Sequence, residues 1–306
     1  MALDVSGLSL HVKNDSFKIA TKAVAGAKLA QSLINSGNYQ SGIKGFAPIL
    51  KMDSTVNFSS GASCGRNVIG DTTLSDKLLQ VVAIKDNQNI CPKVLYNTYF
   101  GAALAKGQDP QGETISGEVV DKIVEKRVQL VNKAVEDLLW KGQKSITGTT
   151  SNLRFIDGIK EQAKTANGGH DVTVTGSTIQ KLQALFLATP VEVRTAEDFK
   201  IYLGEDTYAK YLIELATANI YKPTEDMKLF GTTAMLFPTS GLNGAGEAYA
   251  MKEDNLQLGM DGDSEQEKFS LTYSIETENW YQDVHFAVGI SVVYPEQVYF
   301  TNDLAA

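Results

Sequence analysis

The strongest constraint on the fold comes from a long predicted helix. Apolar residues recur at helical spacing over residues 117–141. These residues are Val120, Ile123, Val124, Val128, Val131, Val135, Leu138 and Leu139. Ser116 can cap the start, Glu118 lies in the first turn where the helix dipole favours a negative charge, and Gly142 follows the last turn. At ~1.5 Å per residue, the predicted helix spans on the order of 37 Å, enough to act as the spine of a large subunit.

A second amphipathic helix is predicted over residues 16–36. Its apolar residues are spaced three or four apart: Ile19, Ala23, Ala27, Ala30 and Leu33. Ser16 can cap its start, and Gly37 provides the stop. Because this face is thin and rich in alanine, the helix needs another surface to lie against.

Between the two helices, the sequence predicts a long hairpin. Residues 54–58 are extended, residues 59–65 are small and flexible, and residues 66–70 and 78–84 are extended again. Two extended arms joined by a tip rich in glycine and serine form a hairpin. A loop of this length within a compact domain indicates a function.

The other predicted elements are mixed but segregated along the chain. They comprise a short helix beginning at 89–95, a polar linker at 106–112, helices at 176–188 (ended by Pro190) and 206–218, and strands at 199–204, 269–275 and 285–294. From residue 227 to residue 300 the pattern is mostly β. Because helices and strands do not alternate regularly, the predicted fold class is α+β.

No residue pattern predicts catalysis. The three histidines, His11, His170 and His285, are far apart and lack metal-ligand spacing. Gly241–Gly246 resembles a dinucleotide-binding sequence, but no strand–turn–helix unit surrounds it, so a flexible loop is expected. Asp261–Glu265 fails the calcium-loop pattern and is expected to be a solvated acidic turn. Glu136 and Asp137 are adjacent, so they project from different faces of the helix and form no acid–base pair.

Net charge and the number of cysteines limit which kinds of protein this chain could be. The net charge of -8 disfavours a protein that reads nucleic-acid sequence. The first 45 residues nevertheless hold five lysines and two acids, which suits either an arm beside a polyanion or a solvated helix. Cys64 and Cys91 are expected to be buried thiols rather than a disulfide. The sequence contains neither an apolar run that could span a membrane nor a secretory signal, so we expect a cytoplasmic protein.

The order of these elements resembles that of the major capsid proteins of tailed bacteriophages, which share the Hong Kong 97 type of fold. Two local patterns are similar as well: Glu136–Gly142 followed by Phe155–Ile159, and the strand Val284–Val293 followed by Tyr294–Phe300. The resemblance implies five segments: an N-terminal arm (1–40), an extended hairpin called the E-loop (41–88), a peripheral or P domain with the spine helix 117–141 (89–195), an axial or A domain with connecting β segments (196–283), and a return strand to the P domain (284–306).

The resemblance also implies a structural role. Copies of the subunit would assemble as hexamers and pentamers into an icosahedral or prolate head shell that encloses double-stranded DNA without reading its sequence. Separate scaffolding and portal proteins, and decoration proteins, are the implied partners, and no membrane is involved. Assembly would take place in the cytoplasm of the host bacterium and the product would be the virion. The resemblance implies no catalytic, cofactor-binding or metal-binding residue and no cofactor. An encapsulin-like nanocompartment shell, and less so a ligand-binding protein or enzyme, are the alternatives.

Overall fold

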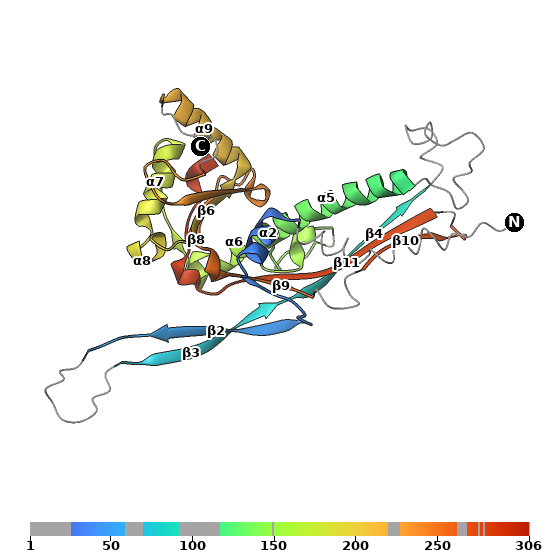
Figure 1. The fold of residues 1–306 in the computed structure, drawn as a ribbon, viewed down its shortest axis with the longest axis horizontal. Helices are drawn as coiled ribbons and strands as arrows, with labels where there is room; N and C mark the ends of the chain where they lie inside the picture. Colours follow the sequence, from blue (N-terminus) through green and yellow to red (C-terminus); the bar gives the residue numbers. More distant parts are fainter. Residues whose placement is uncertain are drawn as a thin grey trace.

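A computed structural model describes residues 26–58, 70–91, 117–148, 150–219, 227–261, 268–274, 276–277 and 279–305. The described part has two lobes and an arm (Figure 1). In the first lobe, the long helix α5 (Gly117–Lys141) lies along extended strands, while the second lobe is a compact group of helices around a sheet. The arm is a two-stranded hairpin that projects away from both lobes.

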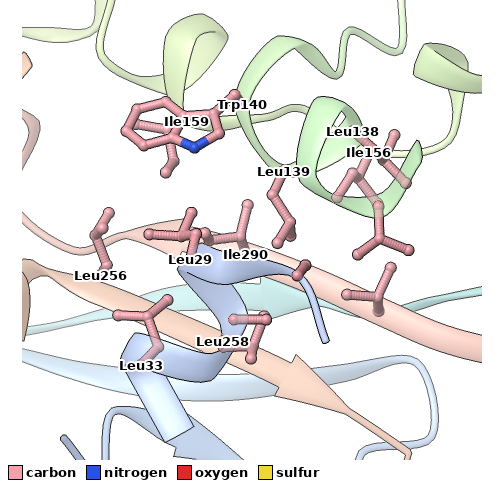
Figure 2. Close-up of a cluster of buried hydrophobic side chains, with 14 of the residues drawn as sticks. Leu29, Leu33, Leu138, Leu139, Trp140, Ile156, Ile159, Leu256, Leu258 and Ile290 are labelled. Atoms are coloured by element: carbon pink, nitrogen blue, oxygen red, sulfur yellow. The ribbon is translucent and has the colours of Figure 1, made fainter. Parts of the chain in front are cut away.

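The first lobe is organised by β11 (Asn279–Val292), the central strand of a five-stranded sheet. β11 pairs antiparallel with β10 (Lys268–Ser274), β4 (Val82–Ile90) and β9 (Leu256–Met260), and β1 (Tyr39–Gln40) extends the sheet by pairing parallel with β9. The helices α5, α6 (Ile159–Gln162) and α2 (Lys28–Asn35) pack on this sheet. Side chains from α2, α5, β9 and β11 meet in its core (Figure 2): Leu29, Leu33, Leu138, Leu139, Trp140, Leu256, Leu258 and Ile290.

The second lobe contains a mixed sheet in the order β5-β12-β8-β6-β7. Its strands are β5 (His170–Asp171), β12 (Tyr299–Thr301), β8 (Ala248–Lys252), β6 (Phe199–Gly204) and β7 (Met235–Thr239). The helices α7 (Thr178–Ala188), α8 (Val191–Arg194) and α9 (Glu205–Thr217) add apolar side chains to a separate core, which includes Leu182, Leu185, Val193, Tyr211 and Leu215. Among the described residues, no helix combines the length and apolar character needed to cross a membrane.

The spine helix begins and ends where the sequence predicts. Val131, Val135, Leu138 and Leu139 are buried, whereas Val128 is only half-buried. Gly142 terminates the helix because the chain must approach another backbone there: a Cβ on Gly142 would lie 2.5 Å from the Ile156 carbonyl oxygen.

The N-terminal helix is confirmed for its second half. α2 covers Lys28–Asn35, and the predicted residues 16–25 lie outside the described part of the chain. Gly37 has φ +81°, and the Asn38 N–H donates to the Leu33 carbonyl at 2.9 Å, which closes the helix with a Schellman motif. The predicted residues Ala27, Ala30 and Leu33 are buried.

Five other predicted elements are confirmed: α7, α9, β6, β10 and the buried strand β11. α7 has a capping box formed by Ser177 and Gln180. The helix expected to begin at residue 89 is wrong at its start, because Asn89 and Ile90 end strand β4 and face Tyr281 and Trp280 of β11. Residues 92–100 lie outside the description.

Packing assigns the described elements to the arm and the two lobes. β4 pairs with β11 over nine residue positions, so the projecting hairpin ends before it, at residue 80. Residues 178–194 pack in the second lobe. Conversely, β9 lies in the sheet of the first lobe. The C-terminal part of the chain contributes to both lobes. β11 lies in the first lobe, and Tyr299–Thr301 pairs with β5 and β8 of the second.

The burial of the spine helix generates a direct test. Val131 is 6% exposed and lies within the first core, so Val131→Asp buries a carboxylate there, and Arg127, one helix turn away, is already paired with Asp86. We expect a loss of at least about 3 kcal/mol in unfolding free energy, measured by urea denaturation. The matched control is Gln129→Asp, on the exposed side of the same helix turn, which should change stability by less than about 0.5 kcal/mol. Equal stability of the two variants would contradict the packing described above.

Candidate assembly surface

The hairpin is formed by β2 (Phe46–Ser54) and β3 (Thr72–Gln80), which pair antiparallel from Phe46↔Gln80 to Ser54↔Thr72. The predicted long hairpin is thereby confirmed for its two arms, while residues 59–69, including the expected tip, lie outside the description. Residues directly opposite each other in such a pair share a face of the ribbon. The register therefore sorts the hairpin into two faces of different chemistry.

The inner face fixes the hairpin to the body. At its base, Ala47 and Ile49 pack against a small core of Ile43, Leu79, Val81 and Ala287. Farther out, the Lys51 ammonium group lies 2.6 Å from Glu296 Oε1 and 5.0 Å from the centre of the Tyr294 ring. The Met52 N–H donates to the Tyr294 hydroxyl oxygen at 3.3 Å, and Lys77 Nζ donates to the Val292 carbonyl oxygen. These contacts hold the hairpin against the loop that follows β11.

The pKa shifts at this attachment follow from its contacts. The hydrogen bond to Glu296 raises the pKa of Lys51. Burial alone would raise the pKa of Glu296, but the hydrogen bond from Lys51 and the charges of Lys51 and Lys77 lower it overall. Burial lowers the pKa of Lys77. Because the pKa of Glu296 is lowered in the folded state, its contribution is complete above the ordinary value of 4.5 and is lost as the pH falls through the lowered value.

The outer face carries an exposed apolar surface, which we call the outer stripe (Phe46, Pro48, Leu50, Met52, Leu74 and Leu78). The exposed fractions of Phe46, Leu50 and Leu74 are 71%, 63% and 65%. Beyond the paired strands, Val56 and Phe58 are 76% and 93% exposed. A contiguous row of large apolar side chains on one face of an isolated ribbon marks an interaction surface rather than ordinary scatter.

Sequence reasoning missed the outer stripe. Its signal was the alternation of Phe46, Pro48, Leu50 and Met52, which has the period of a strand. Alanine and isoleucine stand at two of the intervening positions, Ala47 and Ile49, so the segment looks apolar on both faces and its outward side cannot be identified from the pattern alone. Only the pairing register separates the two faces.

The residues considered for chemistry do not come together. His170 stacks on Tyr299 at 4.6 Å in the second lobe, while His285 lies on β11 and His11 is outside the description. Within the described residues, no group of three or more histidine, cysteine, aspartate or glutamate side chains could hold a metal ion. Asp137 forms an ion pair with Lys141 at 3.6 Å.

Three local expectations are corrected. Cys91 is a free, exposed thiol rather than a buried one, and Cys64 is outside the description. The segment Gly241–Gly246 is not a flexible loop at its start: Gly241 and Leu242 are buried, because Ser240–Leu242 forms a 3-10 turn packed on α5. Asp261 is 1% exposed, so it does not belong to a solvated turn, and residues 262–265 are outside the description.

A cleft of about 320 Å³ lies between α5, β4 and residues 151–155. Its apolar wall includes Leu130, Val131 and Phe286, and Arg127 on its edge forms an ion pair with Asp86. The cleft therefore combines an apolar wall with the Arg127–Asp86 ion pair, and Lys85 and Arg154 also line it.

Comparison with solved structures identifies the fold. The chain is similar to a subunit of the satellite phage P4 procapsid including size determination (Sid) protein, with 12% identity, a TM-score of 0.53, and coverage of 90% of this chain and 99% of that one. It is similar to the capsid of Myoviridae phage XM1, with 15% identity, a TM-score of 0.53, and coverage of 89% and 92%. It is also similar to the cyanophage A-1(L) capsid, with 10% identity, a TM-score of 0.54, and coverage of 88% and 90%.

No family model and no curated protein matches the sequence. The similarity is therefore carried by three-dimensional arrangement, over about nine-tenths of the chain. The predicted α+β fold of phage capsid subunits is confirmed.

The attachment of the hairpin can be tested through Glu296. Glu296→Gln keeps the size of the side chain and removes the charge that Lys51 contacts. We expect amide exchange of Lys51 and Met52 to accelerate about two- to fivefold, corresponding to ~0.4–1 kcal/mol for a partly exposed ion pair. The control is Asp53→Asn, because Asp53 lies 3.9 Å from the same ammonium group and is 60% exposed at its side chain. If both variants exchange like the wild type, the ion pair does not hold the hairpin.

Proposed function

We propose that this protein is the major capsid protein of a tailed bacteriophage, a structural subunit rather than an enzyme. The single observation that carries the proposal is the projecting hairpin, with its inner face fixed to the body and its outer stripe exposed. The similarity to capsid subunits over about nine-tenths of the chain supports the same assignment. The occupant of the outer stripe is a second copy of this chain.

The physical reason lies in how the hairpin distributes apolar area. A two-stranded ribbon has little interior, so side chains on its outer face cannot be buried by their own subunit. Fully burying one leucine or methionine contributes about 1.5–3 kcal/mol, and the stripe offers several such residues along one line. A neighbouring copy that covers the stripe would gain this energy, and repetition of the same contact around an axis would build a ring.

The finer parts of the assignment follow from the capsid-like fold. Hexamers and pentamers would form an icosahedral or prolate shell around double-stranded DNA, with contacts that do not read its sequence. Separate scaffolding and portal proteins, and decoration proteins, would complete the particle. Assembly would take place in the cytoplasm of the host bacterium, and the location of the finished protein would be the virion. Residues 1–40 would form the N-terminal arm and the β2–β3 ribbon the E-loop.

Negative-stain microscopy of the purified protein tests the proposal. Rings or shells support a capsid subunit, and particles that package double-stranded DNA when produced with the other head proteins complete the assignment. Small cages that assemble from this chain alone around a protein cargo would favour an encapsulin-like nanocompartment instead. A monomer at every concentration and salt condition, above all with a bound small molecule, would overturn the structural role.

The outer stripe supplies a prediction that separates folding from assembly. Met52 and Leu74 face each other across the ribbon and are 57% and 65% exposed, so Met52→Ser with Leu74→Ser removes apolar area that is mostly exposed in the isolated subunit. We expect the unfolding midpoint of the isolated subunit to change by less than ~3 °C, because a surface substitution alters the unfolding free energy by about 0.5 kcal/mol or less. Assembly, followed by light scattering, should fall at least about tenfold in rate or extent, because ~1.4 kcal/mol per contact corresponds to a factor of ten.

The control alters β3 on the opposite face of the ribbon. Thr73→Ala with Ser75→Ala alters exposed residues between the stripe positions and should leave assembly unchanged. Normal shells from the Met52/Leu74 variant would show that a neighbouring copy does not cover the stripe.

A further inference from the structure

The N-terminal helix α2 lacks a cap of its own. Its N-cap position is Ala27, which has no side-chain oxygen to accept a hydrogen bond from the first turn. The acceptor comes from the spine helix instead: the Leu29 N–H donates to Glu136 Oε2 at 3.0 Å. A side chain far along the sequence therefore does what an N-cap residue normally does.

The same carboxyl group also binds the second lobe. Thr239, the last residue of β7, is fully buried, and its hydroxyl group donates to Glu136 Oε1. Thr239 Oγ1 in turn accepts the Gly241 N–H at 3.3 Å, in the turn that packs on α5. Glu136 thus joins three parts of the chain: the N-terminal helix, the spine helix and the turn after β7.

Glu136 is 1% exposed, and among the described residues no cation forms an ion pair with it. The nearest charge from α2 is Lys28, whose ammonium group lies 3.7 Å from Glu205 at the start of α9. Asp206 accepts the Gly244 N–H, and Lys141 donates to the Asn243 carbonyl, so the charged groups on the side of the turn are engaged with its backbone. Asp137, the neighbour of Glu136 on the spine helix, is paired with Lys141.

We propose that Glu136 is a proton-operated latch for the N-terminal helix, holding α2 to the body more firmly when its carboxyl group is neutral than when it is ionised. A neutral carboxyl group keeps a contact with both partners: its carbonyl oxygen accepts the Leu29 N–H, and its hydroxyl group donates to Thr239 Oγ1, which then no longer donates to Glu136. An ionised group keeps the two contacts but must be buried without a counter-ion, which costs free energy that two hydrogen bonds do not fully offset.

The direction of the pH effect follows from the burial. Desolvation raises the pKa of Glu136, and the hydrogen bonds from Thr239 and Leu29, the indole group of Trp140 and the charge of Lys28 only partly oppose this. When α2 undocks, the carboxyl group meets water and returns toward the ordinary value of 4.5. A pKa raised in the docked state means that docking is strongest below about 4.5 and weakens as the pH rises through the raised value.

The latch acts on a segment whose release has consequences. Leu29, Ala30 and Leu33 are fully buried in the first core, so undocking α2 uncovers the apolar surface of β9 that they contact. A second polar attachment sits one turn along: Ser32 donates to Glu253, which forms an ion pair with Lys200 at 2.6 Å. The experiment must therefore separate the Glu136 contact with α2 from the Glu253 contact.

Hydrogen exchange of the α2 amides, Leu29 to Leu33, in the full-length protein between pH 4 and 8 provides that test, after correction for intrinsic exchange rates. In the wild type, the opening constant should rise about tenfold per pH unit above 4.5 and level off past the raised pKa of Glu136, since one proton is linked to opening. Glu136→Gln, the neutral mimic, accepts from Leu29 and donates to Thr239, so its opening constant should be independent of pH. Amides of β8 serve as the reference for global unfolding.

Two further variants keep the test decisive. Glu253→Gln should retain the wild-type slope, because it alters the other carboxylate that contacts α2. Thr239→Val removes one hydrogen bond to the ionised form and should move the plateau to higher pH, which tests the latch even if Glu136→Gln does not fold. A pH-independent wild type, an unchanged slope in Glu136→Gln, or a slope that disappears in Glu253→Gln would each overturn the proposal. None of these outcomes depends on whether the protein builds a shell.

Discussion

The rest of the structure depends on the close packing of the last turns of α5 between the two lobes. Trp140 is fully buried, and its ring lies 5.5 Å from Tyr202 and 5.7 Å from Tyr249 of the second sheet, so this side chain joins the spine helix to the second lobe within the first core. Glycines make this approach possible. A Cβ at Gly241 would lie 2.4 Å from Trp140 Cδ1, and one at Gly158 would lie 2.7 Å from the Trp140 carbonyl oxygen. The two ends of the spine helix therefore differ in their surroundings. Its buried C-terminal end packs between the two lobes, and its N-terminal end extends along β4, β10 and β11 (Figure 1).

The hairpin, in contrast, is attached to the body with little apolar burial. Near its base, Leu79 is fully buried and Ala47 and Ile49 pack on the body, but farther out the hairpin contacts the body through polar groups, the side chains of Lys51 and Lys77 and the backbone of Met52. Polar contacts fix a direction without adding much apolar burial. The outer stripe consequently remains exposed, while the strands keep a defined register and angle. An arm prepared in this way loses less conformational entropy on binding than a disordered segment of the same composition would.

The sequence predicts the elements whose pattern is purely local. The spine helix, α7, α9 and β6 each have a clear period and a cap or stop, and each is found within about two residues of its expected bounds. The sequence does not predict which lobe an element joins, because that is decided by contacts between distant residues. Tyr299–Thr301 leaves the first lobe to pair with β8, and Leu182 packs in the second core, yet neither carries a local signal for these partners. The burial of Glu136 was missed for the same reason: its partners, Leu29 and Thr239, lie 107 and 103 residues away.

The two elements attached to the body of the subunit, α2 and the hairpin, are each held by a carboxylate. The pKa values of these two carboxylates are shifted in opposite directions because the groups differ in burial and in charge partners. Glu296 is partly exposed and pairs with Lys51, so its pKa is lowered and the hairpin is held best by the ionised form. Glu136 is almost fully buried and pairs with no cation among the described residues, so its pKa is raised and α2 is held best by the neutral form. Acidification therefore weakens the attachment of one element and strengthens that of the other. Because the two carboxylates lie in separate contacts, a change in pH can alter the balance between the two elements without requiring the cores to rearrange.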